Sequence, residues 1–232
     1  MDALILAGGL GTRLRPAVAD RAKSVAPVAG RPFLSYVMDH LAKSGMVSRF
    51  ILCVGHHADS VCEAFGSLSS DIPILYSRES HPLGTGGALR QAAAELAPAP
   101  PFLALNGDTI IRLRIENFVA FHRAHKADLT LALSHAKNAE RFGTVALEGA
   151  RITSFAARGN AVRGWINGGM YLFSPRATRA LLAMPENFSL ENDFFPSQIS
   201  TLHCAGYRTR ASFLDIGTPD DYDRAALILR GH

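Results

Sequence analysis

Residues 3–16 read Ala-Leu-Ile-Leu-Ala-Gly-Gly-Leu-Gly-Thr-Arg-Leu-Arg-Pro, an apolar run that leads directly into a glycine-rich segment. The apolar run predicts a buried strand. Glycines at the carboxyl end of such a strand let several backbone N–H groups converge on one anion. Arg13 and Arg15 add fixed positive charge and forked donors that suit phosphate oxygens. A turn with a structural role alone needs the glycines but neither arginine, so the segment predicts a strand followed by a phosphate-binding loop.

Two familiar phosphate loops are excluded. The dinucleotide-binding pattern G-x-G-x-x-G would need a third glycine at position 14, which is Leu14. No G-x-x-x-x-G-K-[ST] pattern occurs in the chain, which excludes a P-loop nucleotide hydrolase.

Strand and helix patterns alternate beyond this opening. We expect strands at 49–54, 72–76 and 102–105, and helices from Pro32 to Gly45, at 59–65 and at 88–96. Later segments predict strands at 129–133, 144–147, 152–155, 166–173 and 212–214, and helices at 175–183, after Leu190 and from Pro219, capped by Thr218. This order predicts a Rossmann-like α/β fold, with a mixed and mainly parallel sheet sandwiched by helices, in one domain over residues 1–232.

The predicted parallel strands end in residues suited to ligand binding. Such sheets bind ligands at the carboxyl ends of their strands. The glycine-rich segment, Gly55-His56 and Asn106-Gly107-Asp108 all follow strands, so we expect these three segments to converge on one crevice.

Composition narrows the class of protein further. The chain has 232 residues, 48% hydrophobic and 19% charged, which is typical of a globular protein. Its net charge of +4 suits an anionic substrate, but no basic run predicts nucleic-acid binding. Three cysteines without a C-x-x-C spacing indicate reduced thiols, and the short apolar runs indicate neither a signal peptide nor a membrane span, so we expect a cytoplasmic protein. The pair His122-x-x-His125 lacks a third metal ligand, and we expect it on an exposed helix face.

The opening segment, with Lys23 in Ala22-Lys23-Ser24-Val25-Ala26-Pro27-Val28, resembles the sugar-1-phosphate nucleotidyltransferases. Their signature reads G-G-x-G-T-R-L-x-P and then P-K-P-x-x-P-V. The first half is complete here, and the second departs from it at Ala22 and Ser24. The resemblance runs from Ala3 to Tyr222 and implies a GT-A-like nucleotidyltransferase domain; it leaves the oligomeric state open, a homo-oligomer included.

The reaction that the resemblance implies joins two polyanions. An oxygen of a sugar 1-phosphate attacks the α-phosphorus of a nucleoside triphosphate and pyrophosphate leaves, so the protein must position the reactants and neutralise charge. The resemblance implies Mg²⁺ held by Asp108 and Asp215, with catalysis assigned to Arg13, Lys23, Asp108 and Asp215.

Further residues are implied for the two substrates. For the nucleotide they are Leu6, Ala7, Gly8, Gly9, Gly11, Thr12, Arg13, Leu83, Gly84, Thr85, Gly86, Gly87, Asn106 and Asp108. For the sugar they are Glu140, Gly143, Arg158, Asn167, Gly168 and Glu191, with Arg158 standing where the family usually has a lysine. Simpler interpretations remain open: residues 83–87 as a glycine-rich helix entry, Asn167-Gly168 as a turn, and Ser189-x-x-Asn192 as a loose capping box.

Within the family, the likeness is nearest to the D-glycero-α-D-manno-heptose 1-phosphate guanylyltransferases, which implies GTP as the nucleotide and a role in bacterial surface polysaccharide synthesis, of capsule or lipopolysaccharide. The cues include Leu83-Gly84-Thr85-Gly86-Gly87-Ala88, Phe188-Ser189-Leu190-Glu191 and Asp215-Ile216-Gly217-Thr218-Pro219. N-acetylmuramate 1-phosphate uridylyltransferase and mannose-1-phosphate guanylyltransferase are the alternatives. A non-catalytic nucleotide-binding regulator is the hypothesis from another functional class, and it predicts the loss of a metal aspartate or of the phosphate lysine.

Overall fold

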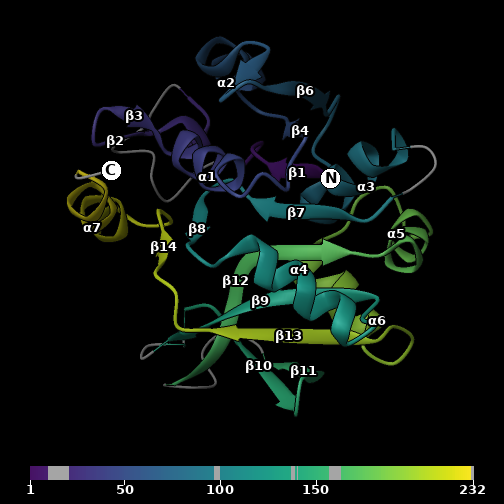
Figure 1. Ribbon diagram of the computed structural model, residues 1–232. Coiled ribbons are helices and arrows are strands. Elements are labelled where there is room, and N and C mark those ends of the chain that lie inside the picture. Colours follow the sequence, from purple (N-terminus) through teal and green to yellow (C-terminus); the bar gives the residue numbers. More distant parts are fainter. Residues whose placement is uncertain (10–20, 97–99, 137–138, 140, 157–162, 231–232) are drawn as a thin grey trace.

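The computed structural model describes residues 1–9, 21–96, 100–136, 139, 141–156 and 163–230. Within these ranges, ten strands form one sheet (Figure 1). Their order across the sheet is β10 (Thr144–Glu148), β11 (Arg151–Ala156), β13 (Cys204–Thr209), β9 (Leu129–Ala136), β12 (Gly164–Phe173), β7 (Phe102–Asn106), β1 (Asp2–Leu6), β4 (Arg49–Val54), β6 (Ile72–Arg78) and β5 (Leu68–Ser69).

The strand directions confirm the predicted mixed sheet. β1 pairs in parallel with both β4 and β7, β4 with β6, and β9 with β13. β12 runs antiparallel to β7 and β9, and it joins the two halves of the sheet. The carboxyl ends of β1 and β7 therefore meet at one edge, where Leu6 pairs with Asn106.

Helices cover both faces of the sheet, as predicted. Along β1, Ala3 and Ile5 pack into one core and Leu4 into the other, because successive side chains point to opposite faces. The first core includes residues of α1 (Phe33–Ala42), α2 (Ala58–Phe65), α4 (Ile115–Ala124) and α7 (Pro219–Leu229). The second includes residues of α3 (Gly84–Ala94), α5 (Pro175–Leu182), the π-helix η2 (Leu190–Phe194) and α6 (Phe195–Gln198).

Short elements complete the fold around the first core. They are the 3₁₀ turn η1 (Lys23–Val25), the β2 (Pro27–Val28) and β3 (Arg31–Pro32) pair, and the β8 (Thr109–Ile111) and β14 (Phe213–Asp215) pair. The predicted cap of α7 is confirmed, since the Thr218 side chain accepts a hydrogen bond from the Asp221 N–H.

Several elements differ from the sequence-based expectation. β8 and β13 were not predicted, and α3 begins at Gly84 rather than at Ala88. The expectation of an exposed face for His122 is wrong: this side chain is buried, and its Nδ1 lies 2.7 Å from Thr130 Oγ1 on β9. His125 is exposed, so only one histidine of the pair faces solvent.

The glycines at the start of α3 allow a close approach to residues 186–188. A Cβ at Gly87 would lie 2.1 Å from the Glu186 carbonyl oxygen, and one at Gly86 would overlap the Phe188 ring. The N–H groups of Gly86 and Gly87 both donate to the Phe188 carbonyl, at 2.9 and 3.3 Å. Residues 186–188 therefore cap α3, whose first N–H groups have no partner within the helix.

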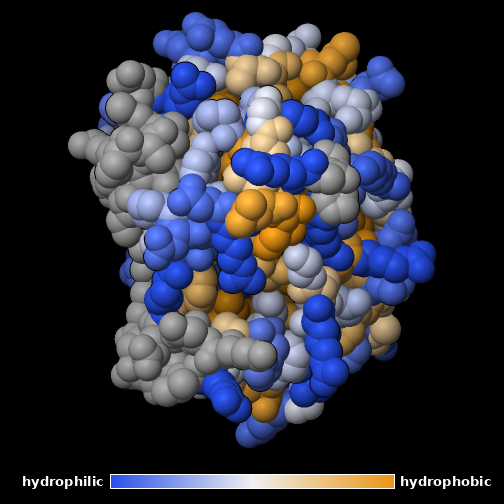
Figure 2. Space-filling model, turned by 90° about the vertical axis from the view of Figure 1, so that its left-hand side faces the viewer, coloured by the Kyte–Doolittle hydropathy of each residue, from blue (hydrophilic) through white to orange (hydrophobic). Residues whose placement is uncertain are grey.

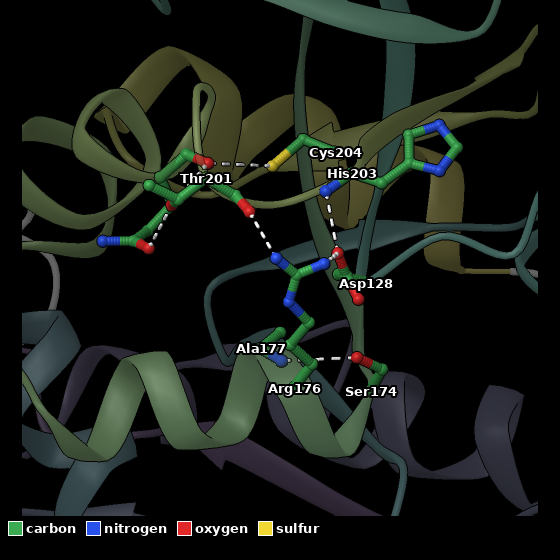
Figure 3. Close-up of polar contacts among 8 residues, drawn as sticks. Asp128, Ser174, Arg176, Ala177, Thr201, His203 and Cys204 are labelled. Carbon is green, nitrogen blue, oxygen red and sulfur yellow. Dashed lines mark hydrogen bonds and ion pairs between the residues drawn. The ribbon is translucent and has the colours of Figure 1, made fainter.

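A polar cluster fixes the edge of the sheet opposite the carboxyl ends of β1 and β7 (Figure 3). Asp128 precedes β9, and its Oδ2 accepts hydrogen bonds from Arg176 Nη1 at 3.1 Å and from the His203 N–H at 2.9 Å. Arg176 also donates to the Thr201 carbonyl at 2.9 Å. The cluster ties the start of α5 to the segment that enters β13.

One face of the molecule is mostly polar. Figure 2 shows a largely hydrophilic face with a small hydrophobic group near its centre. Among the residues that the structure describes, the exposed large apolar side chains are Leu68, Leu75, Leu227 and Ile228. In the part of the chain that the structure describes, no helix combines the length and the apolar character that crossing a membrane would require.

Candidate functional site

A cavity of about 760 Å³ opens at the carboxyl ends of β1 and β7. Leu6, Ala7 and Gly9 line it from the end of β1, and 106–108 line it from the end of β7. Gly55 lies beside this wall, because a Cβ at Gly8 would come within 2.7 Å of the Gly55 nitrogen. The predicted convergence is confirmed for the ends of β1 and β7, whereas Gly55 and His56 are both outside the cavity lining.

Lys23, Asp108 and Asp215 meet on the cavity wall. Lys23 Nζ lies 2.5 Å from Asp108 Oδ2 and 3.8 Å from Asp215 Oδ1. The pairing of β8 with β14 explains the meeting, since it sets Asp215 opposite Thr109, the residue after Asp108. The Ile216 N–H also donates to the Asp108 carbonyl at 3.1 Å. A short strand that the sequence did not reveal thus joins two carboxylates that lie far apart in the chain.

The electrostatic environment of this group favours a cation between the carboxylates. Burial and the nearby Asp108 charge raise the pKa of Asp215, while the Lys23 ammonium and the Gly217 N–H oppose the increase. The side chains of Lys23 and Asp215 are only 11% and 17% exposed, so their charges interact in a poorly solvated setting.

The donor set also fits Mg²⁺. Among the described residues there is no group of three or more histidines, cysteines, aspartates and glutamates placed to hold a metal. Two carboxylates match what Mg²⁺ usually takes from a protein, because phosphate oxygens and water complete its coordination.

The cavity lining also includes three of the residues predicted for the sugar: Gly143, Asn167 and Glu191. Glu191 Oε2 accepts hydrogen bonds from Thr85 Oγ1 at 2.9 Å and from Ser189 Oγ at 3.3 Å. Ser189 Oγ in turn accepts from the Asn192 N–H at 3.1 Å, so the capping interpretation holds together with a place for Glu191 in the cavity. Gly168 lies outside the lining, and a Cβ there would meet Ile111 Cδ1 at 2.8 Å.

The segment predicted to approach the base has one residue in the cavity lining, Thr85. Leu83 is buried, and Gly84, Gly86 and Gly87 face residues 186–188. In the part of the chain described, these glycines serve the packing of α3, which agrees with the simpler interpretation of a helix entry.

Six of the residues singled out from the sequence lie outside the described residues: Gly11, Thr12, Arg13, Arg15, Glu140 and Arg158. The structure therefore adds nothing on their roles.

Sequence reasoning missed Glu79, which follows β6 at the same edge of the sheet. Its carboxyl group lies against Gly8 and Gly55, where added Cβ atoms would come within 3.2 and 3.3 Å of Oε1. Oε2 accepts a hydrogen bond from the Leu83 N–H at 3.0 Å, and partial burial raises the pKa of this carboxyl. The signal was an acidic residue directly after a predicted strand of the parallel sheet. Aromatic lining by Phe142, Phe155 and Phe195 was also missed.

Comparisons with known proteins identify the family. The family model described as nucleotidyl transferase matches residues 2–230. The D-glycero-alpha-D-manno-heptose 1-phosphate guanylyltransferase of Aneurinibacillus thermoaerophilus is 38% identical over 97% of this chain and 96% of its own length. The enzyme of the same name from Campylobacter jejuni is 33% identical over 96% and 97%. The crystal structure of HddC from Yersinia pseudotuberculosis complexed with GMP-PN has 32% identity and a TM-score of 0.85, covering 98% of both chains.

Proposed function

This chain belongs to the nucleotidyl transferase family, and from that premise we propose that it joins GTP to D-glycero-α-D-manno-heptose 1-phosphate, forming the nucleotide sugar and releasing pyrophosphate. The observation that carries the proposal is the meeting of Lys23, Asp108 and Asp215 in a cavity between a glycine-rich strand end and a polar sugar side. The intact set argues against a non-catalytic regulator. We place the reaction in the cytoplasm, in one domain over residues 1–232, as a source of activated sugar for surface polysaccharide.

In the proposed reaction, a phosphate oxygen of the sugar 1-phosphate forms a bond to the α-phosphorus of GTP. The bond from that phosphorus to the oxygen bridging to the β-phosphate breaks, and pyrophosphate leaves with the electron pair. No covalent enzyme intermediate is needed, so catalysis consists of placement and charge stabilisation. Lys23 supplies positive charge where the phosphoryl group transfers, and we assign Arg13 with the backbone of residues 8–12 to the β- and γ-phosphates.

Asp108 and Asp215 would hold Mg²⁺, whose charge helps neutralise the phosphates when it is bound. On the sugar side, Asn167 and Glu191 offer the amide and carboxylate groups that hydroxyl recognition requires.

Glu79 supports guanine as the base. Guanine presents two adjacent donors, N1–H and the N2 amino group, which a carboxylate accepts together. Uracil presents one N–H between two carbonyl oxygens, and a carboxylate repels those oxygens. A half-buried carboxyl next to the glycine-rich segment therefore favours GTP over UTP.

A substrate matrix tests the whole proposal. GTP, UTP, ATP and CTP are each combined with the 1-phosphates of D-glycero-α-D-manno-heptose, mannose and N-acetylmuramate, and pyrophosphate release is measured. We expect the highest kcat/KM for GTP with the heptose phosphate. A preference for mannose 1-phosphate, or a tenfold preference for UTP with the muramate substrate, would assign the chain to one of the alternative transferases.

Substitution Glu79→Gln tests the base assignment separately. Loss of one acceptor should lower kcat/KM for GTP by about 10- to 100-fold, because one N–H donor of the bound guanine is left unpaired. The ratio of kcat/KM for GTP to kcat/KM for UTP should fall as a result. Glu63→Gln on the exposed side of α2 is the matched control. An unchanged GTP-to-UTP ratio would remove Glu79 from base recognition.

A further inference from the structure

Strand β12 carries an irregularity where it passes the cavity. Asn167 pairs with Leu133 and Tyr171 with Leu131, so four residue steps on β12 face two on β9. The extra residues form a bulge, and within it Gly169 has a φ of +72°. A Cβ at Gly169 would lie 2.4 Å from Thr109 Oγ1, so the bulge depends on glycine there.

The bulge brings two side chains of one strand together. Residues four apart on a regular strand are separated by about 13 Å. Here Asn167 Nδ2 donates a hydrogen bond to Tyr171 Oη at 2.8 Å. The other end of the same amide is also held, because Asn167 Oδ1 accepts from the Gly169 N–H at 2.9 Å. These two bonds define which end of the amide is which and fix its plane at the cavity wall.

The Tyr171 hydroxyl is buried beneath the cavity wall. The side chain is fully buried between the strands and α6, with its ring 5.0 Å from that of Phe195. Its hydroxyl accepts the hydrogen bond from Asn167, which lines the cavity. The hydroxyl thus lies directly behind an amide of the predicted sugar side.

We infer that Tyr171 is a positioning residue for the sugar phosphate: its hydroxyl orients the Asn167 amide so that the remaining N–H and lone pair of that amide face the sugar. Tyr171 is beneath the cavity lining and touches neither substrate. The inference rests on the proposed function, in which Asn167 contacts the sugar. It assigns a role to a tyrosine that burial alone would class as core.

Tyr171→Phe is the direct test, since it removes the hydroxyl and keeps the ring. We expect the KM for the sugar phosphate to rise by about five- to thirtyfold, the scale of one misplaced hydrogen bond, while the KM for GTP changes less than twofold. Tyr36→Phe is the matched control, because Tyr36 is also buried and donates to the Val28 carbonyl at 3.0 Å, away from the cavity lining. Both variants should lose some thermal stability, but only Tyr171→Phe should show the split between the two KM values.

A double-mutant cycle with Asn167→Ala separates the possible results. If Tyr171 acts through Asn167, adding Tyr171→Phe to Asn167→Ala should raise the sugar KM no further. Equal changes in both KM values for Tyr171→Phe, or fully additive effects in the cycle, would overturn the inference and leave Asn167 as a sugar contact. An unchanged sugar KM for Asn167→Ala alone would instead contradict the proposed function at that residue.

Discussion

Lys23 and Arg13 are both assigned to phosphate groups, but their contributions should differ. Arg13 is proposed to contact the β- and γ-phosphates in ground and transition states alike, whereas Lys23 stands beside Asp108 and Asp215, where charge moves during transfer. Arg13→Ala should therefore raise the KM for GTP, and Lys23→Ala should chiefly lower kcat. Steady-state kinetics with each substrate varied in turn will distinguish them. Changes in KM alone for both variants would refute the role given to Lys23.

The two aspartates provide a second test at this scale. Asp108→Ala and Asp215→Ala should each lower kcat by about 100-fold or more, because removing one of two carboxylates leaves a divalent ion poorly held. EDTA should abolish turnover, and added Mg²⁺ should restore it. Asp39→Ala, at the exposed ion pair with Arg31, is the control. Full turnover in EDTA would rule out the metal assignment.

The packing of α4 against β9 predicts a pH-dependent stability. Burial lowers the pKa of His122 from its ordinary 6.5 to about 4. Between pH 6.5 and pH 4 the unfolded chain binds a proton at this histidine and the folded chain does not. The contribution of His122 to the free energy of unfolding is therefore fully present above pH 6.5 and is lost as the pH falls toward 4. The loss amounts to up to about 3 kcal/mol from this residue.

Urea unfolding at pH 7 and pH 5 will measure this effect. His122→Gln should flatten the pH dependence, whereas His125→Gln at an exposed position should not. Burial lowers the pKa of His40 as well, so some dependence will persist in the first variant. Identical pH profiles for the wild type and His122→Gln would show that His122 is not the group responsible.

Prediction from the sequence succeeded where local patterns and tertiary packing agree. The strand at 49–54 is buried and apolar from Phe50 to Val54, and its predicted bounds are confirmed. β13 was not predicted because Cys204–Thr209 lacks the alternating pattern of a half-buried strand. Its position between β9 and β11 depends on tertiary pairing, which the local sequence does not reveal. α3 was predicted too short because glycines disfavour helices, a preference that contact with residues 186–188 overrides.

The residues of the candidate site also fall into those that local patterns reveal and those that only the fold reveals. Asp108, Asp215 and Lys23 could be found from motifs, because each lies in a recognisable segment. Glu79 and Tyr171 could not, since their significance depends on which strand ends and which bulge they stand beside. Such relations exist only after the chain has folded.

At the scale of the whole molecule, the Asp128 cluster and the cavity lie at opposite edges of the sheet. Asp128→Ala removes the acceptor of Arg176 and of the His203 N–H. Because a largely buried carboxylate is lost, we expect about 2 kcal/mol of destabilisation and a Tm lower by roughly 4–8 °C. KM and kcat should stay within twofold of the wild type at 25 °C. Asp59→Ala, at an exposed ion pair, should lower the Tm far less. Altered substrate affinity in Asp128→Ala would show that the two edges are coupled.

The antiparallel pairing of β12 with β7 separates the residues proposed for the nucleotide from those proposed for the sugar. The residues proposed for the base and the phosphates precede this boundary, whereas Gly143, Asn167 and Glu191 all come from the segment between 127 and 212. After this segment, β14 pairs with β8 and contributes Asp215, the second aspartate. A lineage could therefore diversify its sugar by changing one continuous stretch of gene while the coding sequence for nucleotide recognition stayed intact. By the same reasoning, chimeras that exchange this stretch between relatives should change the sugar accepted and keep the nucleotide.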